Sequence, residues 1–162
     1  MRPGAAPLQP GRAWRRPAPT RRYSVSEVPA PSVPPGGSDA PSGPRFTFVE
    51  AVLGAPDPVA LGGFWSDLLG WHVVRSSPEW VVVRPPDGGT GLAFQLETDH
   101  VPPTWPAGPG DQQMQQHLDV RVDDLAAGVD RAVALGARLA EFQPQDDVRV
   151  LLDPAGHPFC LF

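Results

Sequence analysis

Residues 57–70 read Asp57-Pro58-Val-Ala-Leu-Gly-Gly-Phe-Trp-Ser-Asp-Leu-Leu-Gly70 and carry every signal of one capped helix. Asp57 is a favoured N-cap residue, and proline is well tolerated at the first helical position. Apolar side chains then recur at the i, i+3, i+4, i+7 spacing of a single helix face: Leu61, Phe64, Trp65 and Leu68. Gly70 is placed to end the helix in the left-handed conformation. The stretch therefore predicts an amphipathic helix between Asp57 and Gly70.

Apolar stretches on both sides of this helix predict four strands. One precedes it, at residues 46–53, and three follow it, at residues 71–75, 79–84 and 91–97. A Pro-Pro-Asp-Gly-Gly turn at residues 85–89 separates the last two strands. The order is thus strand, helix, strand, strand, strand.

The same order returns in the second part of the chain. Residues 117–122 alternate as a strand does, and Asp123 or Asp124 then caps a second helix that ends at Gly136. Three further strands are predicted at residues 137–142, 147–152 and 157–162, with an Asp-Pro-Ala-Gly turn at 153–156 before the last of them. A Pro-rich connection at residues 98–116 joins the two units, either as a functional flap or as a simple crossover.

Nearly constant offsets relate the two units. The cap residues Asp57 and Asp124 lie 67 positions apart, and both the helix-ending glycines and the turn aspartates (Asp87 and Asp153) lie 66 apart. Three matches in the same order indicate an internal repeat. The predicted fold is therefore α+β. Two βαβββ modules, at about residues 45–98 and 115–162, pair into a cupped eight-stranded half-barrel with a shared cleft.

Composition separates residues 1–44 from this body. The first 44 residues hold eleven prolines and six arginines against two acids, whereas residues 45–162 hold seven arginines against sixteen acids. A segment so poor in apolar side chains cannot offset its ordering entropy, so we expect a disordered Pro/Arg-rich extension before one domain at 45–162. The acidic body argues against partners that are nucleic acids or anionic membranes.

A single cysteine, Cys160, excludes an internal disulfide and a cysteine-rich zinc cage. No stretch of the sequence approaches the ~20 apolar residues that span a bilayer. These observations are compatible with a reducing compartment, and we expect a cytoplasmic protein.

Three stretches resemble the vicinal oxygen chelate superfamily, which includes glyoxalase I, bleomycin-resistance proteins and extradiol dioxygenases. They are the first helix with the Leu-Leu-Gly-Trp that ends it at 68–71, the strand and cap at 117–125, and the Asp-Pro-Ala-Gly-His-Pro-Phe turn at 153–159. The nearest likeness is to small bacterial glyoxalase-like proteins. It covers residues 45–162, and it implies the paired-module fold, a metal-centred cleft and, commonly, a homodimer.

The resemblance also implies four metal-ligand positions, on the first and last strands of each module. They fall on Glu50 and His117, which are 67 residues apart, and on Gln95 and Cys160, which are 65 apart. Active members usually carry a carboxylate where this chain has Cys160, and Gln95 is a weak neutral ligand. The set is incomplete for an oxygen-chelating metal; Zn²⁺ would accept it best, with Ni, Mn or Fe(II) as other candidates.

Each of these residues also has a simpler interpretation. Glu50 could pair with His117 without a metal, because a charge within an apolar strand needs a partner. His117 could bond a neighbouring strand or Asp119, Gln95 could satisfy backbone groups, and Cys160 could be a small buried hydrophobe. The remaining histidines receive no chemical role.

Two functions follow from this set. The first is a metal-dependent lyase, isomerase or dioxygenase that acts on a small oxygen-chelating substrate. The second is a metal-free protein that sequesters a small, partly aromatic molecule, in the manner of bleomycin-resistance proteins. The aromatic cleft residues expected for the second are Trp80, Phe94, Trp105 and Phe159.

Overall fold

Helix α1 (Pro58–Leu69) begins and ends where the sequence predicts, in a computed structural model that describes residues 44 and 46–162. The Asp57 side chain accepts a hydrogen bond from the backbone N–H of Ala60 at 2.9 Å, which satisfies a donor that has no partner within the helix. Gly70 has a φ of 66° and donates its N–H to the carbonyl of Ser66. The left-handed glycine therefore closes the helix as expected.

The first module places α1 on one face of a four-stranded sheet. The strand order is β1-β4-β3-β2, with β1 parallel to β4 and the other pairs antiparallel; the strands are β1 (Glu50–Ala55), β2 (His72–Ser76), β3 (Trp80–Arg84) and β4 (Gly91–Leu96). Side chains that alternate toward the helix are buried, such as Val81, Val83 and Phe94. The opposite face of the sheet carries the polar side chains of Glu50, Arg84 and Gln95.

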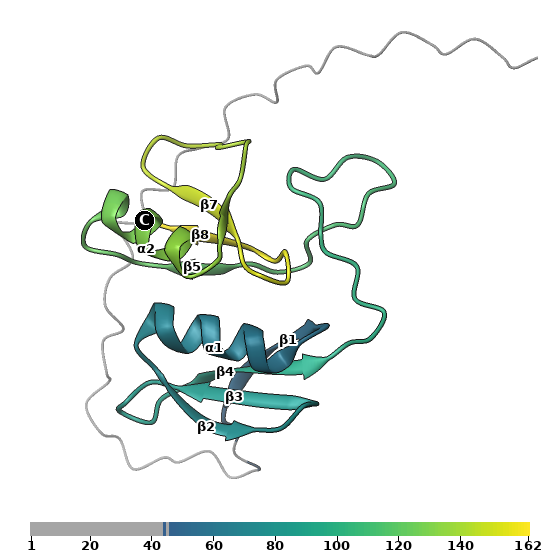
Figure 1. Cartoon of the computed structure of the whole chain (residues 1–162), viewed down its shortest axis with the longest axis vertical. Helices are drawn as coiled ribbons and strands as arrows, with labels where there is room; N and C mark the ends of the chain where they lie inside the picture. Colours follow the sequence, from purple (N-terminus) through teal and green to yellow (C-terminus); the bar gives the residue numbers. More distant parts are fainter. Residues whose placement is uncertain (1–43, 45) are drawn as a thin grey trace, which may run out of the picture. The chain divides into compact units, whose positions relative to one another are not determined.

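The second module repeats this arrangement, with order β5-β8-β7-β6 and β5 parallel to β8. Its elements are β5 (Leu118–Val120), α2 (Leu125–Ala134), β6 (Arg138–Leu139), β7 (Arg149–Leu152) and β8 (Pro158–Leu161). Asp124 is the N-cap of α2, and its side chain accepts from the N–H of Ala127 at 3.0 Å. The α+β fold with two equivalent βαβββ modules is thereby confirmed. The eight strands form two four-stranded sheets (Figure 1).

The largest departure from the sequence prediction concerns the strand expected at 137–142, of which only the two residues of β6 are paired as a strand. The side chain of Gln143 forms hydrogen bonds with neighbouring backbone groups in place of further strand pairing. Its amide nitrogen donates to the carbonyls of Ala140 and Val150, and its oxygen accepts from the N–H of Val150 at 2.8 Å. Since the Gln143 side chain supplies these bonds, the segment after β6 can separate from β7 while the backbone groups of Ala140 and Val150 keep their hydrogen-bond partners.

Aromatic side chains join the two modules in a common core. Trp65 of α1 is 0% exposed and lies 5.1 Å, centroid to centroid, from the ring of Phe159 on β8. Phe64 also meets Phe159 edge-on, at 6.1 Å. The helix of one module therefore packs against a strand of the other.

Two segments complete the description. Residues 98–116 connect the modules without a helix or strand. No helix in the part of the chain that the structure describes is long and apolar enough to cross a membrane. The disordered extension expected at residues 1–44 falls outside the described residues, apart from Pro44.

Candidate functional site

Three potential metal ligands come together on the second module: His117, Asp119 and Cys160. Asp119 of β5 lies directly beside Cys160 of β8 in the strand register, and His117 precedes Asp119 by two residues, on the same face. His117 Nε2 lies 3.2 Å from Asp119 Oδ1. One ligand atom from each of the three residues lies within 4.8 Å of the others. We call these residues the donor group.

Cys160 is the partly buried member of the donor group. Burial, the negative charge of Asp119 and a hydrogen bond to Asp119 together raise the pKa of the Cys160 thiol to about 11. The thiol therefore holds its proton at neutral pH when no cation is near. It is an inert side chain in that state, and it becomes a ligand only when a metal ion displaces the proton.

The other two residues predicted as ligands, Glu50 and Gln95, are not part of the donor group. Glu50 Oε2 accepts a hydrogen bond from Arg84 on β3 at 2.7 Å, in a half-buried ion pair. Gln95 is exposed, and its amide donates to Glu97 at 2.8 Å. The structure thus brings together His117 and Cys160 from the predicted set and adds Asp119. It gives Glu50 an arginine partner that the sequence did not suggest.

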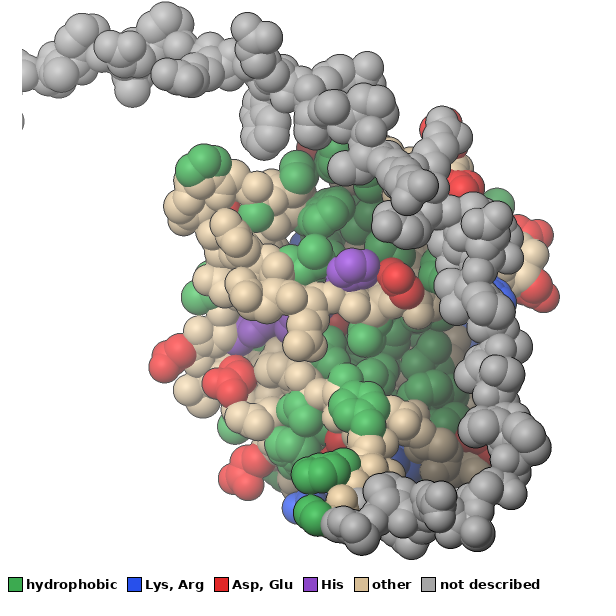
Figure 2. Space-filling model, turned by 180° about the vertical axis from the view of Figure 1, so that it is seen from behind, with side chains coloured by type: hydrophobic (Ala, Val, Ile, Leu, Met, Phe, Trp, Pro, Cys, Tyr) green, Lys and Arg blue, Asp and Glu red, His purple; other side chains and the backbone are tan. Residues whose placement is uncertain are grey.

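A cavity of about 370 Å³ adjoins the donor group at His117. Its walls are residues 51–54 of β1, several residues of the connection and of the start of β5, and His157; the lining residues from the connection and β5 are His100, Val101, Pro103, Gln112, Gln113, Gln115, Gln116, His117 and Leu118. Three of the four histidines in the chain line this one cavity. On the face of the molecule drawn in Figure 2, histidine side chains reach the surface at two places, and one lies beside an acidic side chain.

None of the four aromatic residues expected in the cleft lines this cavity. Phe94 and Phe159 are 0% exposed, because they alternate toward the helices and fill the core. Trp80 is half-buried on β3, and Trp105 donates its indole N–H to the carbonyl of Phe142 at 3.2 Å. The lining instead combines the histidines and four glutamines with apolar side chains of β1 and the connection, so it suits a ligand with both polar and apolar parts; the glutamines are Gln112, Gln113, Gln115 and Gln116.

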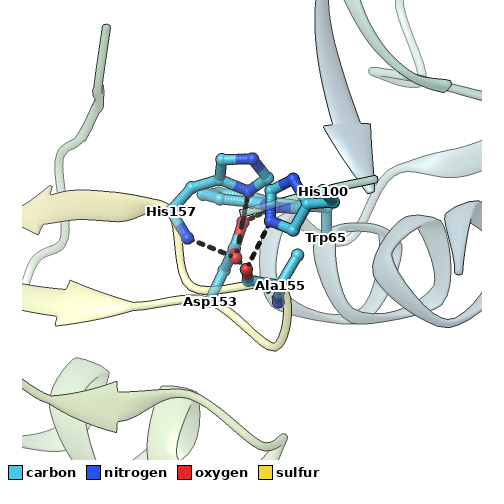
Figure 3. Close-up of polar contacts among 5 residues, drawn as sticks. All are labelled: Trp65, His100, Asp153, Ala155 and His157. Atoms are coloured by element: carbon cyan, nitrogen blue, oxygen red, sulfur yellow. Dashed lines mark hydrogen bonds and ion pairs between the residues drawn. The ribbon is translucent and has the colours of Figure 1, made fainter. Parts of the chain in front are cut away.

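A second polar cluster reaches the cavity through His157 and His100 (Figure 3). The Asp153 carboxylate is 1% exposed and accepts from His157 Nδ1 at 3.0 Å and from the indole N–H of Trp65 at 3.2 Å. His100 Nε2 lies 2.8 Å from the carbonyl oxygen of Ala155, and the two imidazole rings are 5.1 Å apart.

Sequence reasoning identified Asp153 only as a turn residue and gave both histidines no role. The turn is present, with the N–H of Gly156 bonded to the carbonyl of Asp153 at 2.9 Å. One signal for the pair was nevertheless in the sequence, since His157 follows Asp153 by four residues across a tight turn. No sequence signal placed His100 beside them, because its position depends on the path of a long connection.

Comparison with known proteins agrees with this architecture. A crystal structure of a glyoxalase/bleomycin resistance protein/dioxygenase family enzyme from Burkholderia phytofirmans is 19% identical and has a TM-score of 0.54, with 70% of this chain and 95% of that one covered. A glyoxalase-related enzyme from Fulvimarina pelagi is 22% identical, with a TM-score of 0.52 and coverage of 71% and 86%. A possible glyoxalase from Bacillus cereus is 15% identical, with a TM-score of 0.50 and coverage of 73% and 99%. These likenesses concern the fold.

No curated protein matches the chain. A sequence model of the glyoxalase-like domain matches residues 50–162, which is well over half of the 162 residues and includes both modules. The protein therefore belongs to the glyoxalase-like family of the vicinal oxygen chelate superfamily.

Proposed function

We propose that this protein binds a divalent transition metal, Zn²⁺ in the first place, through His117, Asp119 and Cys160, and that the site acts on a small oxygen-bearing molecule in the adjoining cavity. The observation that carries the proposal is the meeting of three ligand atoms within 4.8 Å, from two neighbouring strands, with His117 also in the cavity wall. His117 therefore belongs both to the donor group and to the cavity wall, so a metal ion bound there would lie next to a molecule in the cavity.

The donor set fits zinc better than the other candidate metals. A thiolate, an imidazole and a carboxylate are all zinc ligands, and three protein ligands leave a coordination position free, as in catalytic zinc sites. When bound, the metal would supply Lewis-acid polarisation of an oxygen on the substrate. Since zinc is not redox-active, this set favours a lyase or isomerase over a dioxygenase.

Metal content and affinity test the proposal. We expect near-stoichiometric zinc in the wild-type protein, and at least a tenfold weaker zinc affinity in Cys160→Ser and in His117→Ala, measured by titration calorimetry. Glu50→Gln is the matched comparison, because Glu50 was the other predicted ligand and its carboxylate is paired with Arg84. Unchanged affinity in Glu50→Gln supports the three-residue site, whereas a loss there would restore Glu50 to the ligand set.

A metal-free binding protein is the second candidate, favoured by the cavity itself. Its lining of histidines and glutamines offers hydrogen bonds to a polar molecule without any cation. If Zn, Mn, Ni and Fe(II) each fail to bind, this alternative replaces the first. A thermal-shift screen with small polar compounds would then identify the ligand class, with Gln113→Ala and Gln116→Ala as the variants expected to weaken binding.

We also expect a homodimer. Apolar side chains are exposed on the edge strand β2, with Val73 47% and Val74 56% exposed, and before β1, where Phe48 is 71% exposed. Both outer strands of this sheet thus have exposed apolar side chains on or next to them, and exposed apolar residues at a sheet edge are typical of surfaces that pair with another chain. Light scattering coupled to size exclusion should give twice the chain mass, and the monomer mass at micromolar concentration would contradict it.

A further inference from the structure

The Asp153 carboxylate is saturated with hydrogen bonds. Oδ1 accepts from the backbone N–H groups of Ala155 at 3.0 Å and His157 at 2.9 Å, and Oδ2 accepts from Trp65 and from the ring of His157. A buried carboxylate is costly unless its lone pairs are satisfied, and here both oxygens are held in place. Asp153 cannot turn away from His157 without breaking bonds to two other residues.

These contacts fix the proton positions on two imidazole rings (Figure 3). A carboxylate only accepts hydrogen bonds, so His157 Nδ1 carries a proton and, in the neutral ring, Nε2 keeps its lone pair. A carbonyl oxygen also only accepts, so His100 Nε2 donates to Ala155, and the lone pair of that ring lies on Nδ1. The neighbouring rings therefore adopt opposite tautomers.

The lone pair on His157 is available to a ligand. The His157 side chain is 17% exposed and lines the cavity, and within residues 46–162 its Nε2 has no hydrogen-bond partner. A carboxylate behind Nδ1 also stabilises the positive charge that the ring would gain on accepting a proton at Nε2.

We propose that His157, oriented by Asp153, is a general base that takes a proton from a C–H or O–H group of the molecule held in the cavity. The proton moves to His157 Nε2, and the electron pair of the broken bond stays on the ligand as an enolate or alkoxide. Return of the proton to a carbon or oxygen of the ligand restores the neutral ring. Asp153 is the positioning residue in this pair. The inference rests on the proposed function for its ligand, and it involves none of the donor group.

Nuclear magnetic resonance tests the tautomers directly. In protein labelled with ¹⁵N-histidine, long-range ¹H–¹⁵N correlations should show the Nδ1–H tautomer for His157 and the Nε2–H tautomer for His100, with assignments from His157→Gln and His100→Gln. Asp153→Asn should lose the Nδ1–H preference of His157. A merely structural Asp153 would leave that preference unchanged in a folded variant. An Nε2–H tautomer of His157 in the wild-type protein would overturn the inference.

Carbethoxylation tests whether the lone pair can be reached. Diethyl pyrocarbonate reacts with an unprotonated ring nitrogen, and the exposed His72 serves as the internal reference. Peptide mass spectrometry should show His157 modified at a rate within about threefold of His72, and about tenfold more slowly when Asp153→Asn removes the orienting carboxylate. If Asp153→Asn does not fold, wild-type modification at pH 7 decides alone. No modification of His157 while His72 reacts would overturn the proposal.

The two proposals fail separately. His157→Gln leaves His117, Asp119 and Cys160 unchanged, so zinc affinity should stay within about twofold of wild type if both are right. A wild-type protein that binds no metal but shows the expected tautomers of His157 and His100 would overturn only the metal proposal. A wild-type protein that binds zinc but has the Nε2–H tautomer of His157 would overturn only the proposal that His157 is a general base.

Discussion

Two aspartates at equivalent positions of the repeat have different surroundings. Asp87, in the turn of the first module, accepts the N–H of Gly89 at the surface. Asp153, at the same place in the second module, is buried and accepts four different donors. The turn motif accounts for the backbone bond in both copies. Tertiary packing brings the indole of Trp65 to Asp153, and the turn itself brings the imidazole of His157.

The pH dependence of zinc binding is an expected outcome at this scale. Because burial and Asp119 raise the pKa of Cys160 to about 11, the metal-free thiol is protonated throughout the neutral range. Metal binding must displace that proton, so zinc affinity should rise about tenfold per pH unit between pH 7 and pH 9. Competition with a chromophoric chelator at several pH values measures this slope. In Cys160→Ser the same interval should show a markedly flatter curve, and an equal slope in both proteins would contradict thiolate ligation.

The sequence indicated two members of the donor group and did not indicate the third as a ligand, for physical reasons. His117 and Cys160 were predicted as ligands because the family resemblance implies ligand positions on the first and last strands of each module, and the structure brings these two side chains together. Asp119 was named only as a partner for His117, since its role depends on the β5–β8 register. The pairing of Glu50 with Arg84 was missed, because the two residues are 34 positions apart and meet only when β1 and β3 join one sheet.

At the scale of elements, the contact between α1 and its sheet depends on one glycine. A Cβ atom at Gly62 would lie 2.5 Å from Val81 Cγ1 and 3.4 Å from the ring of Phe94. At the adjacent Gly63, a Cβ atom would meet nothing within 4 Å. The two residues share a helix and a backbone conformation but differ in what faces them.

This contrast gives a matched pair of variants. Gly62→Ala should lower the free energy of unfolding by about 1–3 kcal/mol, because the added methyl group overpacks the contact with β3. Gly63→Ala should raise it by about 0.5–1 kcal/mol, because alanine loses less backbone entropy in a helix. Urea unfolding followed by circular dichroism measures both. Equal effects of the two substitutions would mean that α1 does not approach the sheet this closely.

Caps and apolar periodicity made the helices predictable from the sequence. The lengths of the short strands could not be predicted in this way. Asp57, Gly70 and Asp124 mark helix ends through local bonds, which a sequence displays directly. The strand predicted at 137–142 shrinks to β6 because Gln143 replaces strand bonds with side-chain bonds. Such competition depends on a partner strand, β7, that local sequence does not reveal.

At the scale of the whole molecule, the bond between Trp65 and Asp153 joins the two modules. Trp65→Phe keeps an aromatic ring in the core but removes the indole N–H, so the buried carboxylate loses one donor. We expect a loss of about 1–3 kcal/mol in the free energy of unfolding, with both modules still unfolding in one transition. Coincident urea curves from tryptophan fluorescence and circular dichroism would verify the single transition. Two separated transitions in the wild-type protein would show instead that the modules fold independently.

The Trp65–Asp153 bond also makes the orientation of His157 depend on how tightly the two halves are docked. The Asp153 carboxylate that orients the imidazole of His157 also accepts a hydrogen bond from Trp65 of α1, which belongs to the first module. Trp65 belongs to α1, and no residue of that helix lines the cavity. A side chain remote from the cavity therefore shares one carboxylate with a ring that borders it, and a substitution at Trp65 changes the surroundings of His157 without altering the cavity wall.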